Sequence, residues 1–513
     1  MSRYTARTEH WALLAIVLFR FANAFSLATF FQPDEFFQAL EPAHNIVFGY
    51  GYITWEWHER LRSALHPLLY AAAYKAVRFV LSERATIDLA PKLVGALIAS
   101  SIDVGTYRVA WYVTRDSRVA RAALLMSLAS AWNWYVLARS FSNNLETALT
   151  LAALAQWPWH GKSARNVFYA CLWAGASCIV RPTNALVWLF LGGTLVCAHW
   201  KHPKTLFSFA VAAFAAGILS LALAACSDRY FYGEWTFPLW NFVEFNVVRN
   251  LSVFYGSAPW HFYVGQGLPL MLMAYLPFFV CGSVRALYSG GALAKLSGAV
   301  LFVMATFSTI AHKEWRFLQP VYPAMLILAA AELVRWRAWH WRRSLFCALA
   351  FHAVVAFFFS RVHERGALDL VAWARSDPTV QSLGLLTPCH STPWHATMHR
   401  PDFVDSWFLT CEPPLHLATG NVENVRAYRD ESDRFFDHPQ QFLQHELGTP
   451  SRPWPSHLVV FEPHEKIVQD HVGPKYVMCR RFFNTYFHWD PRRAGDIVVF
   501  QLRDPASGTS SPQ

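Results

Sequence analysis

Two polar stretches beside long apolar runs carry the side chains best suited to chemistry. The first, residues 312–316, holds four ionisable side chains, His312, Lys313, Glu314 and Arg316. The second begins just after the first apolar run, with the adjacent carboxylates Asp34 and Glu35. Ionisable groups so close to lipid are costly unless they face a wet or polar site. We therefore interpret both stretches as parts of a functional site.

The residue types indicate which chemistry such a site would perform. A carboxylate pair can bind a cation, relay a proton or act as a general base. Asp34 and Glu35 point in different directions in either an extended or a helical backbone, so one of them is expected to face the site. Lys313 and Arg316 offer the charge-assisted donors that bind phosphate. The structural alternatives are a helix start after Pro33 and a basic interfacial anchor at 312–316.

The composition predicts a polytopic α-helical membrane protein. Apolar residues make up 54% of the 513 positions and charged residues only 15%, which is not the balance of a soluble chain. The net charge of +10 comes from short Lys/Arg clusters between apolar runs. Such clusters are typical of cytoplasmic loops, so we expect no nucleic-acid partner.

The apolar runs predict about 11 transmembrane or re-entrant helices. The first run, residues 11–31, is long enough to span a bilayer and follows a basic segment, 1–10, that we expect to be a cytoplasmic N-terminus. A polar, aromatic loop at 32–63 comes next. The later runs are 64–81, 89–113, 119–138, 145–159, 166–180, 183–199, 205–227, 268–288, 292–311, 317–334 and 343–360. Of these, 64–81 is interpreted as an interfacial or re-entrant helix, because the basic residues near 115–121 are expected to be cytoplasmic.

Three basic loops set the expected orientation of the rest of the chain. Residues 159–165, 199–204 and 335–343 are predicted to be cytoplasmic, and counting from them places 312–317 on the outer side together with 32–63. The same count places Arg181 at an outer turn and 228–267 in an outer loop. Asn250 in that loop lies in an N-glycosylation pattern.

The segment after residue 360 predicts a small outer domain of mixed α and β structure. Residues 361–503 contain short alternating strands at 457–461 and 496–500, whereas 504–513 is interpreted as a disordered tail. Residues 11–360, with the loop 32–63, would then form the transmembrane catalytic domain. Cys389 and Cys411 are the expected disulfide pair because they are close in sequence. No cysteine or histidine spacing predicts a metal site.

Two further charged residues call for an explanation. Asp103 lies inside an apolar run, so it must be paired or face a cavity, and we give it a supporting role. Arg181 before Pro182 is a candidate second phosphate contact, with an interfacial arginine as the alternative.

The two stretches together resemble the signature of a known enzyme family. Pro33-Asp34-Glu35 with the hexamer His312 to Phe317 is similar to the paired motif of GT-C type membrane glycosyltransferases of family 22, the endoplasmic-reticulum mannosyltransferases that use dolichyl-phosphate mannose. Residues 47–57 and 386–393 most resemble the members that act on the glycosylphosphatidylinositol (GPI) anchor precursor. Phe36-Phe37 departs from the Tyr-Trp frequent in relatives, and 406–411 matches only loosely.

The resemblance implies a specific reaction and location. It implies transfer of the third mannose, in α-1,2 linkage with inversion, from dolichyl-phosphate mannose to the GPI precursor at the lumenal face of the endoplasmic reticulum membrane. Asp34 is the expected base and Glu35 the less favoured one. The residues expected at the donor phosphate are His312, Lys313, Arg316 and Arg181, with Glu314 in support. No cofactor is expected, because the family is regarded as metal-independent.

Two other functions are alternatives to this one. A sibling mannosyltransferase of N-glycan precursor assembly would share the chemistry but use another acceptor. A proton- or cation-coupled transporter would use Asp34 or Asp103, but transporters usually contain two similar halves, and the sequence shows no such repeat.

Overall fold

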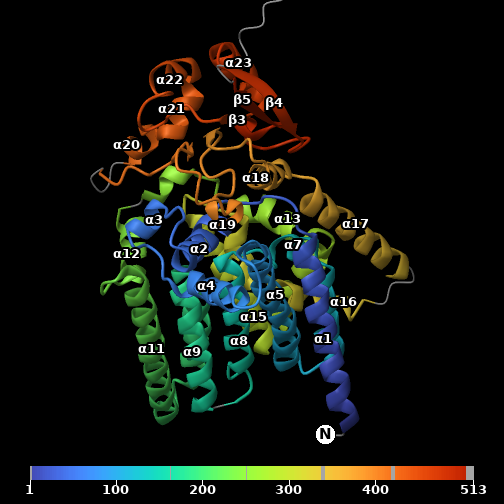
Figure 1. Ribbon diagram of the computed structural model, residues 1–513. Coiled ribbons are helices and arrows are strands. Elements are labelled where there is room, and N and C mark those ends of the chain that lie inside the picture. The colour runs from blue at the N-terminus through green and yellow to red at the C-terminus, as the bar shows by residue number, and fades with distance from the viewer. Residues whose placement is uncertain (1–2, 162, 250, 337–340, 417–421, 504–513) are drawn as a thin grey trace, which may run out of the picture. The chain divides into compact units, whose positions relative to one another are not determined.

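The computed structural model describes residues 3–161, 163–249, 251–336, 341–416 and 422–503 (Figure 1). The chain divides into two compact units. One, here called the membrane unit, comprises residues 1–26, 56–73 and 89–357. The other, the C-terminal unit, comprises 27–55, 74–88 and 358–513. Asn250, the tail 504–513 and part of the basic loop 335–343 lie outside the described residues.

The membrane unit is built of helices that begin and end close to the predicted apolar runs. Within it, α8, α9 and α11 pack side by side (Figure 1). The long helices of the first half are α1 (Arg3–Ser26), α4 (Leu65–Arg78), α5 (Glu83–Thr114), α6 (Ser117–Ala129), α7 (Ala131–Val136), α8 (Ser142–Gln156), α9 (Ala164–Val180), α10 (Ala185–His199) and α11 (Pro203–Tyr232). The second half has α12 (Pro238–Val243), α13 (Leu268–Leu272), α14 (Leu276–Ser289), α15 (Gly291–Thr309), α16 (Tyr322–Leu333) and α17 (Trp341–Arg361).

Several of these helices are long and apolar enough to cross a membrane. By length and composition, five segments of the described chain qualify: 83–114, 203–232, 263–289, 291–309 and 346–376. The helix α4 has only 14 residues, or about 21 Å at 1.5 Å per residue, which is short of a bilayer core of about 30 Å. That length agrees with a helix that does not cross the membrane. The total of about 11 transmembrane or re-entrant helices in the chain stays a prediction.

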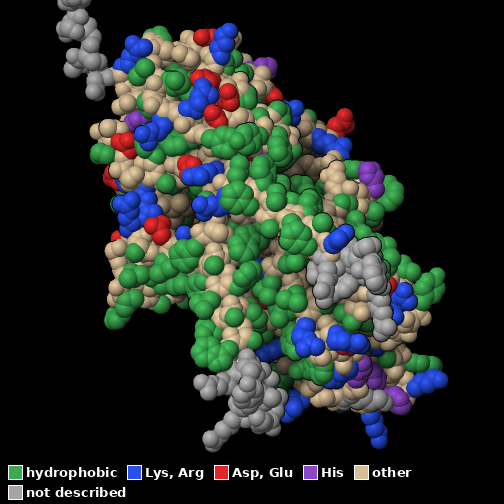
Figure 2. Space-filling model, turned by 90° about the vertical axis from the view of Figure 1, so that its right-hand side faces the viewer, with side chains coloured by type: hydrophobic (Ala, Val, Ile, Leu, Met, Phe, Trp, Pro, Cys, Tyr) green, Lys and Arg blue, Asp and Glu red, His purple; other side chains and the backbone are tan. Residues whose placement is uncertain are grey.

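Exposed apolar side chains cover the outside of the membrane unit. The face shown in Figure 2 exposes hydrophobic side chains over a broad area. On α1, Trp11 and Leu18 are about 60% exposed, and on α17, Phe346 and Val354 are about 70% exposed. A soluble protein rarely shows so much apolar surface. The chain is therefore a multi-pass membrane protein, as its composition predicts.

The intramembrane acid Asp103 is neutralised by a residue that the sequence analysis did not single out. Arg20 of α1 donates to both carboxylate oxygens of Asp103 on α5, at 2.6 and 2.9 Å, and neither side chain is exposed. Asn23 accepts a further bond from Arg20, and Ser127 donates to Asp103. This pair, with its hydrogen bond to Ser127, joins α1, α5 and α6. Asp103 therefore has a structural role in the ion pair, and not a supporting role beside the 312–316 stretch.

The C-terminal unit contains a five-stranded mixed sheet of order β2-β1-β3-β5-β4. The strands β2 (Trp407–Phe408), β1 (Leu383–Leu386) and β3 (His457–Phe461) run parallel, and β5 (Ile497–Leu502) and β4 (Tyr476–Phe482) continue antiparallel. Alternating apolar patterns predicted β3 and β5, and both are confirmed. The small α+β architecture of this region is confirmed as well.

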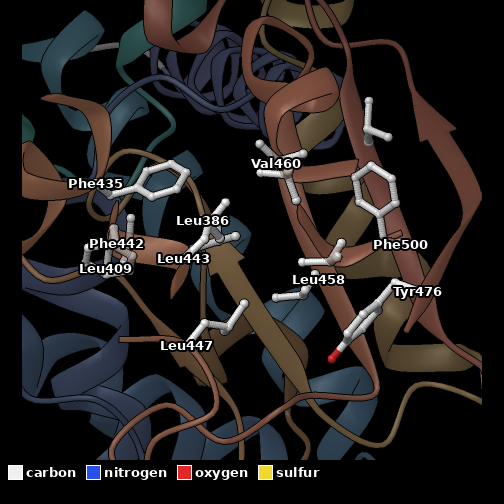
Figure 3. Packing of buried hydrophobic residues seen from close by; sticks show 13 residues of the cluster. Leu386, Leu409, Phe435, Phe442, Leu443, Leu447, Leu458, Val460, Tyr476 and Phe500 are labelled. Carbon is white, nitrogen blue, oxygen red and sulfur yellow. The ribbon is translucent and has the colours of Figure 1, made fainter. Parts of the chain in front are cut away.

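The core of this unit lies between the sheet and short helices. Side chains of β1, β3 and β5 pack against α21 (Glu431–Asp437), α22 (Pro439–His445) and α23 (Glu465–Val472) (Figure 3). Leu386, Leu458 and Phe435 are among the fully buried members. The other helices of the unit are α2 (Glu41–Phe48), α18 (Gly366–Ser376), α19 (His395–Met398) and α20 (Val422–Ala427). Of α3 (Trp55–His58), only Trp55 belongs to this unit.

The first polar loop, which we expected to lie wholly in the transmembrane domain, is divided: residues 32–55 belong to the C-terminal unit and 56–63 to the membrane unit. Backbone N–H groups of Ala28 and Phe30 donate to the carbonyls of Ser360 and Glu364. Further along, the Glu41 carboxylate accepts from the N–H of Ala396 at 2.7 Å. The loop has too few partners of its own for its buried polar groups, and distant residues supply them. A domain boundary placed at residue 360 alone therefore leaves out the association of residues 27–55 with the C-terminal unit.

Candidate functional site

The acidic stretch forms a helical turn at the start of a buried helical segment. The carbonyl of Pro33 accepts bonds from the N–H groups of both Phe36 and Phe37 at 2.9 Å, which opens a π-helical turn over Phe36–Leu40. Asp34 and Glu35 are half-buried in the turn before it. π-Helical turns are rare and often lie at functional sites.

His390 is the residue that the structure adds to this site. The charge of Asp34 acts on His390, whose ring centroid lies 4.3 Å from that of Phe37 and 5.4 Å from that of Phe408. Burial lowers the pKa of His390 to about 4, although Asp34 opposes the shift, so the imidazole is neutral near pH 7. Its Nε2 atom is buried and has no hydrogen-bond partner among the described residues. A buried, unpartnered nitrogen close to a candidate base makes His390 a candidate functional residue.

A disulfide and a left-handed backbone hold His390 in place. Cys389 and Cys411 are joined with their Cα atoms 5.7 Å apart, the pair that the sequence favoured. His390 has φ 56°, a region that non-glycine residues seldom adopt. The three side chains lie within 4.8 Å of one another, as a metal site would require. However, both sulfurs are bonded to each other, so they offer no thiolate to a metal.

A second polar group links the same loop to the C-terminal region. His44 Nε2 is hydrogen-bonded to His399 Nδ1 at 2.9 Å, and burial lowers the pKa of His44 to about 4. Burial raises the pKa of Glu41 to about 7, against the backbone N–H groups of Ala396 and Tyr52, which lower it. A buried carboxyl whose pKa lies this far above its ordinary value is a feature that binary hydropathy patterns cannot reveal.

In the membrane unit, Glu314 organises the cationic stretch. Arg316 donates to both of its carboxylate oxygens, at 2.5 and 2.9 Å, and His312 Nε2 is hydrogen-bonded to it at 3.1 Å. Burial alone would raise the pKa of Glu314, but the charge of Arg316 and the hydrogen bonds from His312 and Arg316 hold it below its ordinary value. Glu314 therefore stays ionised and fixes the orientation of both neighbours.

Lys313 is engaged with the backbone. Its ammonium donates to the carbonyl of Ala258 at 2.8 Å and to that of Ile310. Burial lowers the pKa of Lys313. The side chain thus ties residue 258 of the outer loop to the 312–316 stretch, and binding a phosphate would require it to leave at least one carbonyl.

Arg181 joins the cationic stretch through a polar network at the start of α8. Its guanidinium lies 3.5 Å from Glu146 and donates to Ser142 at 3.2 Å, and it stacks over Phe317. Asn143 donates to the backbone carbonyl of Arg316 at 3.2 Å. The structure therefore brings Arg181 and Arg316 into one network, as a shared site requires.

Two amides of this network take part that the sequence alone did not single out. Asn184 donates to Glu146 at 2.9 Å, and Asn143 donates to the same carboxylate at 3.4 Å. The sequence feature that could have indicated them is the run Ser142-Asn143-Asn144 followed by Glu146, which is a polar start to a helix in an apolar region. The acidic and cationic stretches fall in different compact units, and their sharing of one pocket stays a prediction.

Comparison with known families decides the class of enzyme. The profile of the Alg9-like mannosyltransferase family matches residues 11–399, which is most of the chain. The chain belongs to the Alg9-like mannosyltransferase family. The resemblance drawn from 33–35 and 312–317 is thereby confirmed, and the transporter interpretation is set aside.

Curated relatives match this mannosyltransferase along nearly its whole length. It is 45% identical to GPI mannosyltransferase 3 of Debaryomyces hansenii, covering 94% of this chain and 91% of the relative. Identity to GPI mannosyltransferase 3 of Candida albicans is 43%, covering 98% and 99%. Identity to GPI alpha-1,2-mannosyltransferase 3 of Mus musculus is 34%, covering 96% and 89%.

Solved structures support the fold. The crystal structure of ArnT from Cupriavidus metallidurans bound to undecaprenyl phosphate superposes with a TM-score of 0.58 at 13% identity, covering 99% of this chain and 100% of ArnT. The oligosaccharyltransferase of Archaeoglobus fulgidus gives a TM-score of 0.51 at 13% identity, covering 95% of this chain and 76% of that one. The mannosyltransferase thus has the fold of the GT-C glycosyltransferases, which confirms the predicted fold class.

Proposed function

We propose that this mannosyltransferase transfers the third mannose, in α-1,2 linkage, from dolichyl-phosphate mannose to the GPI anchor precursor. The observation that carries the proposal is the near full-length match to relatives named GPI mannosyltransferase 3, at 43% and 45% identity. The active site would face the lumen of the endoplasmic reticulum, with the N-terminus in the cytoplasm. The distribution of basic loops supports this orientation.

The proposed reaction inverts the configuration at the anomeric carbon. A base removes the proton of the acceptor hydroxyl, the oxygen attacks the anomeric carbon, and the lipid phosphate leaves from the opposite face with both electrons of the broken bond. Asp34 is the base in this scheme. The electrostatic interaction of Asp34 with the buried imidazole of His390 supports the assignment over Glu35.

The leaving phosphate is stabilised by fixed positive charge in the same scheme. Arg316 and Arg181 share a polar network, and Glu314 and Glu146 hold their guanidinium groups in orientation. Such preorganised donors stabilise charge that develops in a transition state. The reaction as proposed uses no metal ion or other cofactor.

The exchange of Asp34 for asparagine tests the proposal. D34N should reduce mannosyl transfer in microsomes by about 100-fold or more, because it removes the base, whereas the matched variant E35Q should retain most activity. The assay follows radiolabelled mannose into lipid extracts of cells that carry only the variant. A precursor arrested at two mannoses supports the assigned acceptor. Near-normal transfer by D34N would show that Asp34 is not the base. Accumulation of an arrested N-glycan oligosaccharide would show that the acceptor is the N-glycan precursor and not the GPI precursor.

A further inference from the structure

An open pocket lies within the membrane unit where three stretches meet. About 320 Å³ of non-atom space lies in and above it, part of which is open solvent. The loop before α4 contributes Leu61, Arg62 and Ser63, and α12 contributes Pro238, Leu239 and Phe242. The remaining lining comes from residues 179–183, at the end of α9 and the start of the turn that follows.

The charges around this pocket suit an anion. Its lining holds two guanidinium groups, Arg62 and Arg181, and no carboxylate among the described residues that line it. Glu56 pairs with Arg62, and Glu146 pairs with Arg181. Because neither acid lines the pocket, these pairs hold the two arginines in orientation without placing negative charge in its wall. Two fixed guanidinium groups are well matched to phosphate oxygens.

The loop that carries Arg62 is itself anchored. The Asp228 carboxylate near the end of α11 accepts from the Ser63 hydroxyl at 2.8 Å and from the N–H of Ala64 at 2.7 Å. Tyr232 donates to the backbone carbonyl of Arg62 at 2.6 Å. The position of Arg62 is therefore built into the fold, as a binding residue requires.

A buried histidine near both arginines provides an independent observation. His66, in the first turn of α4, is 3% exposed, and neither ring nitrogen has a hydrogen-bond partner among the described residues. The charges of Arg62 and Arg181 both act on it. Buried imidazole nitrogens are normally bonded, so this unpartnered ring points to a ligand group nearby. A phosphate bound by the two arginines would lie within electrostatic reach of it.

The surroundings of the pocket favour a phosphate carried by a lipid. Trp240 of α12 is 58% exposed, and Trp235 and Phe237 just before this helix are 72% and 53% exposed. Exposed aromatic side chains at the ends of apolar helices are typical of the membrane–water interface. Leu239 and Phe242 of the same helix give the pocket part of its apolar wall. A lipid head group bound in the pocket would meet the arginines while its chains remain in the bilayer.

We propose that this pocket binds the phosphate ester of a membrane lipid, with Arg62 and Arg181 as its cationic contacts. The inference rests on the proposed function in taking the ligand from the lipid phosphates of that reaction, the polyprenol phosphate of the donor or the phosphodiester of the acceptor. Arg62 thereby becomes a binding residue outside the 312–316 stretch.

Binding measurements on the full-length protein in detergent micelles test this inference without turnover. Dolichyl phosphate, phosphatidylinositol and inorganic phosphate are compared as ligands, with the dissociation constant as the readout. R62A should weaken binding of one of the two lipids at least tenfold. The matched control R60A removes a neighbouring exposed arginine that pairs with Glu234 outside the pocket, and it should bind as the parent protein does. L239W, which fills the pocket and keeps both charges, should weaken binding as well.

The outcomes separate this inference from the proposed function. Unchanged lipid binding by both R62A and L239W would overturn the pocket as the site, as would an equal loss in R60A. Inorganic phosphate that binds as tightly as either lipid would overturn the lipid source. If D34N abolishes transfer while R62A binds normally, the function stands and the pocket fails. If lipid binding depends on Arg62 but no mannose is transferred, the pocket stands and the function fails.

Discussion

At the scale of single residues, an electrostatic interaction within the C-terminal unit favours Asp34 over Glu35 as the proposed base. The charge of Asp34 acts on His390. The imidazole sits among Phe37, Tyr52 and Phe408 with its Nε2 buried. We infer that His390 influences Asp34 through its electrostatic surroundings and does not itself exchange a proton with substrate.

Replacement of His390 by asparagine tests this influence on Asp34. H390N should lower kcat by about 10- to 100-fold, because it changes the electrostatic surroundings of the proposed base, and should leave KM for the donor nearly unchanged. The acid limb of the pH–rate profile should move with the altered surroundings of Asp34, a readout that a purely structural loss would not shift. If activity falls only in proportion to the amount of folded protein and the profile is unmoved, His390 is structural.

Glu41 predicts a pH dependence of stability. Burial raises its pKa to about 7 in the folded protein, above its value of about 4.5 in an unfolded chain. The folded state therefore favours the protonated form, and this contribution to stability is full below pH 4.5 and is lost as the pH rises through 7. The shift corresponds to about 3 kcal/mol at most.

The variant E41Q isolates this effect. Between pH 5.5 and 8 the protease resistance of the C-terminal unit should fall less in E41Q than in the parent protein, because the amide does not titrate. Glutamine also loses one acceptor for the N–H groups of Ala396 and Tyr52, so overall stability should be lower at every pH. An identical pH slope in the two proteins would show that Glu41 does not titrate in this range.

At the scale of elements, a buried ion pair ties α1 to α5. Removing one partner leaves an uncompensated buried charge, which costs about 3–5 kcal/mol. R20M or D103L alone should therefore lower the steady-state level and the heat resistance of the protein in membranes. The double variant R20M/D103L should recover most of both, since no charge remains buried. A double variant as unstable as either single one would indicate that the bonds to Asn23 and Ser127 matter more than the charge.

At the scale of the whole molecule, the proposed reaction requires both polar stretches at the lumenal face. Cysteines introduced at the exposed positions Glu59 and Ser257 should react with an impermeant maleimide only after microsomes are opened, whereas one at His202 should react in intact microsomes. The native free cysteines are replaced beforehand, so that only the introduced cysteines can react. If the cysteines at positions 59 and 257 were labelled from opposite faces of the membrane, a site shared by the two polar stretches would be excluded.

What the sequence by itself determined depends on local patterns. Apolar run lengths predicted the membrane class, alternation predicted β3 and β5, and the short motifs at 33–35 and 312–317 indicated the family, because each signal lies within a few consecutive residues. Tertiary structure alone decided which distant groups meet. The loop 27–55 joins residues beyond 358, Arg20 neutralises Asp103, and Arg62 and Arg181 line one pocket. Buried polar groups must find partners wherever the fold supplies them, and a linear pattern does not encode that choice.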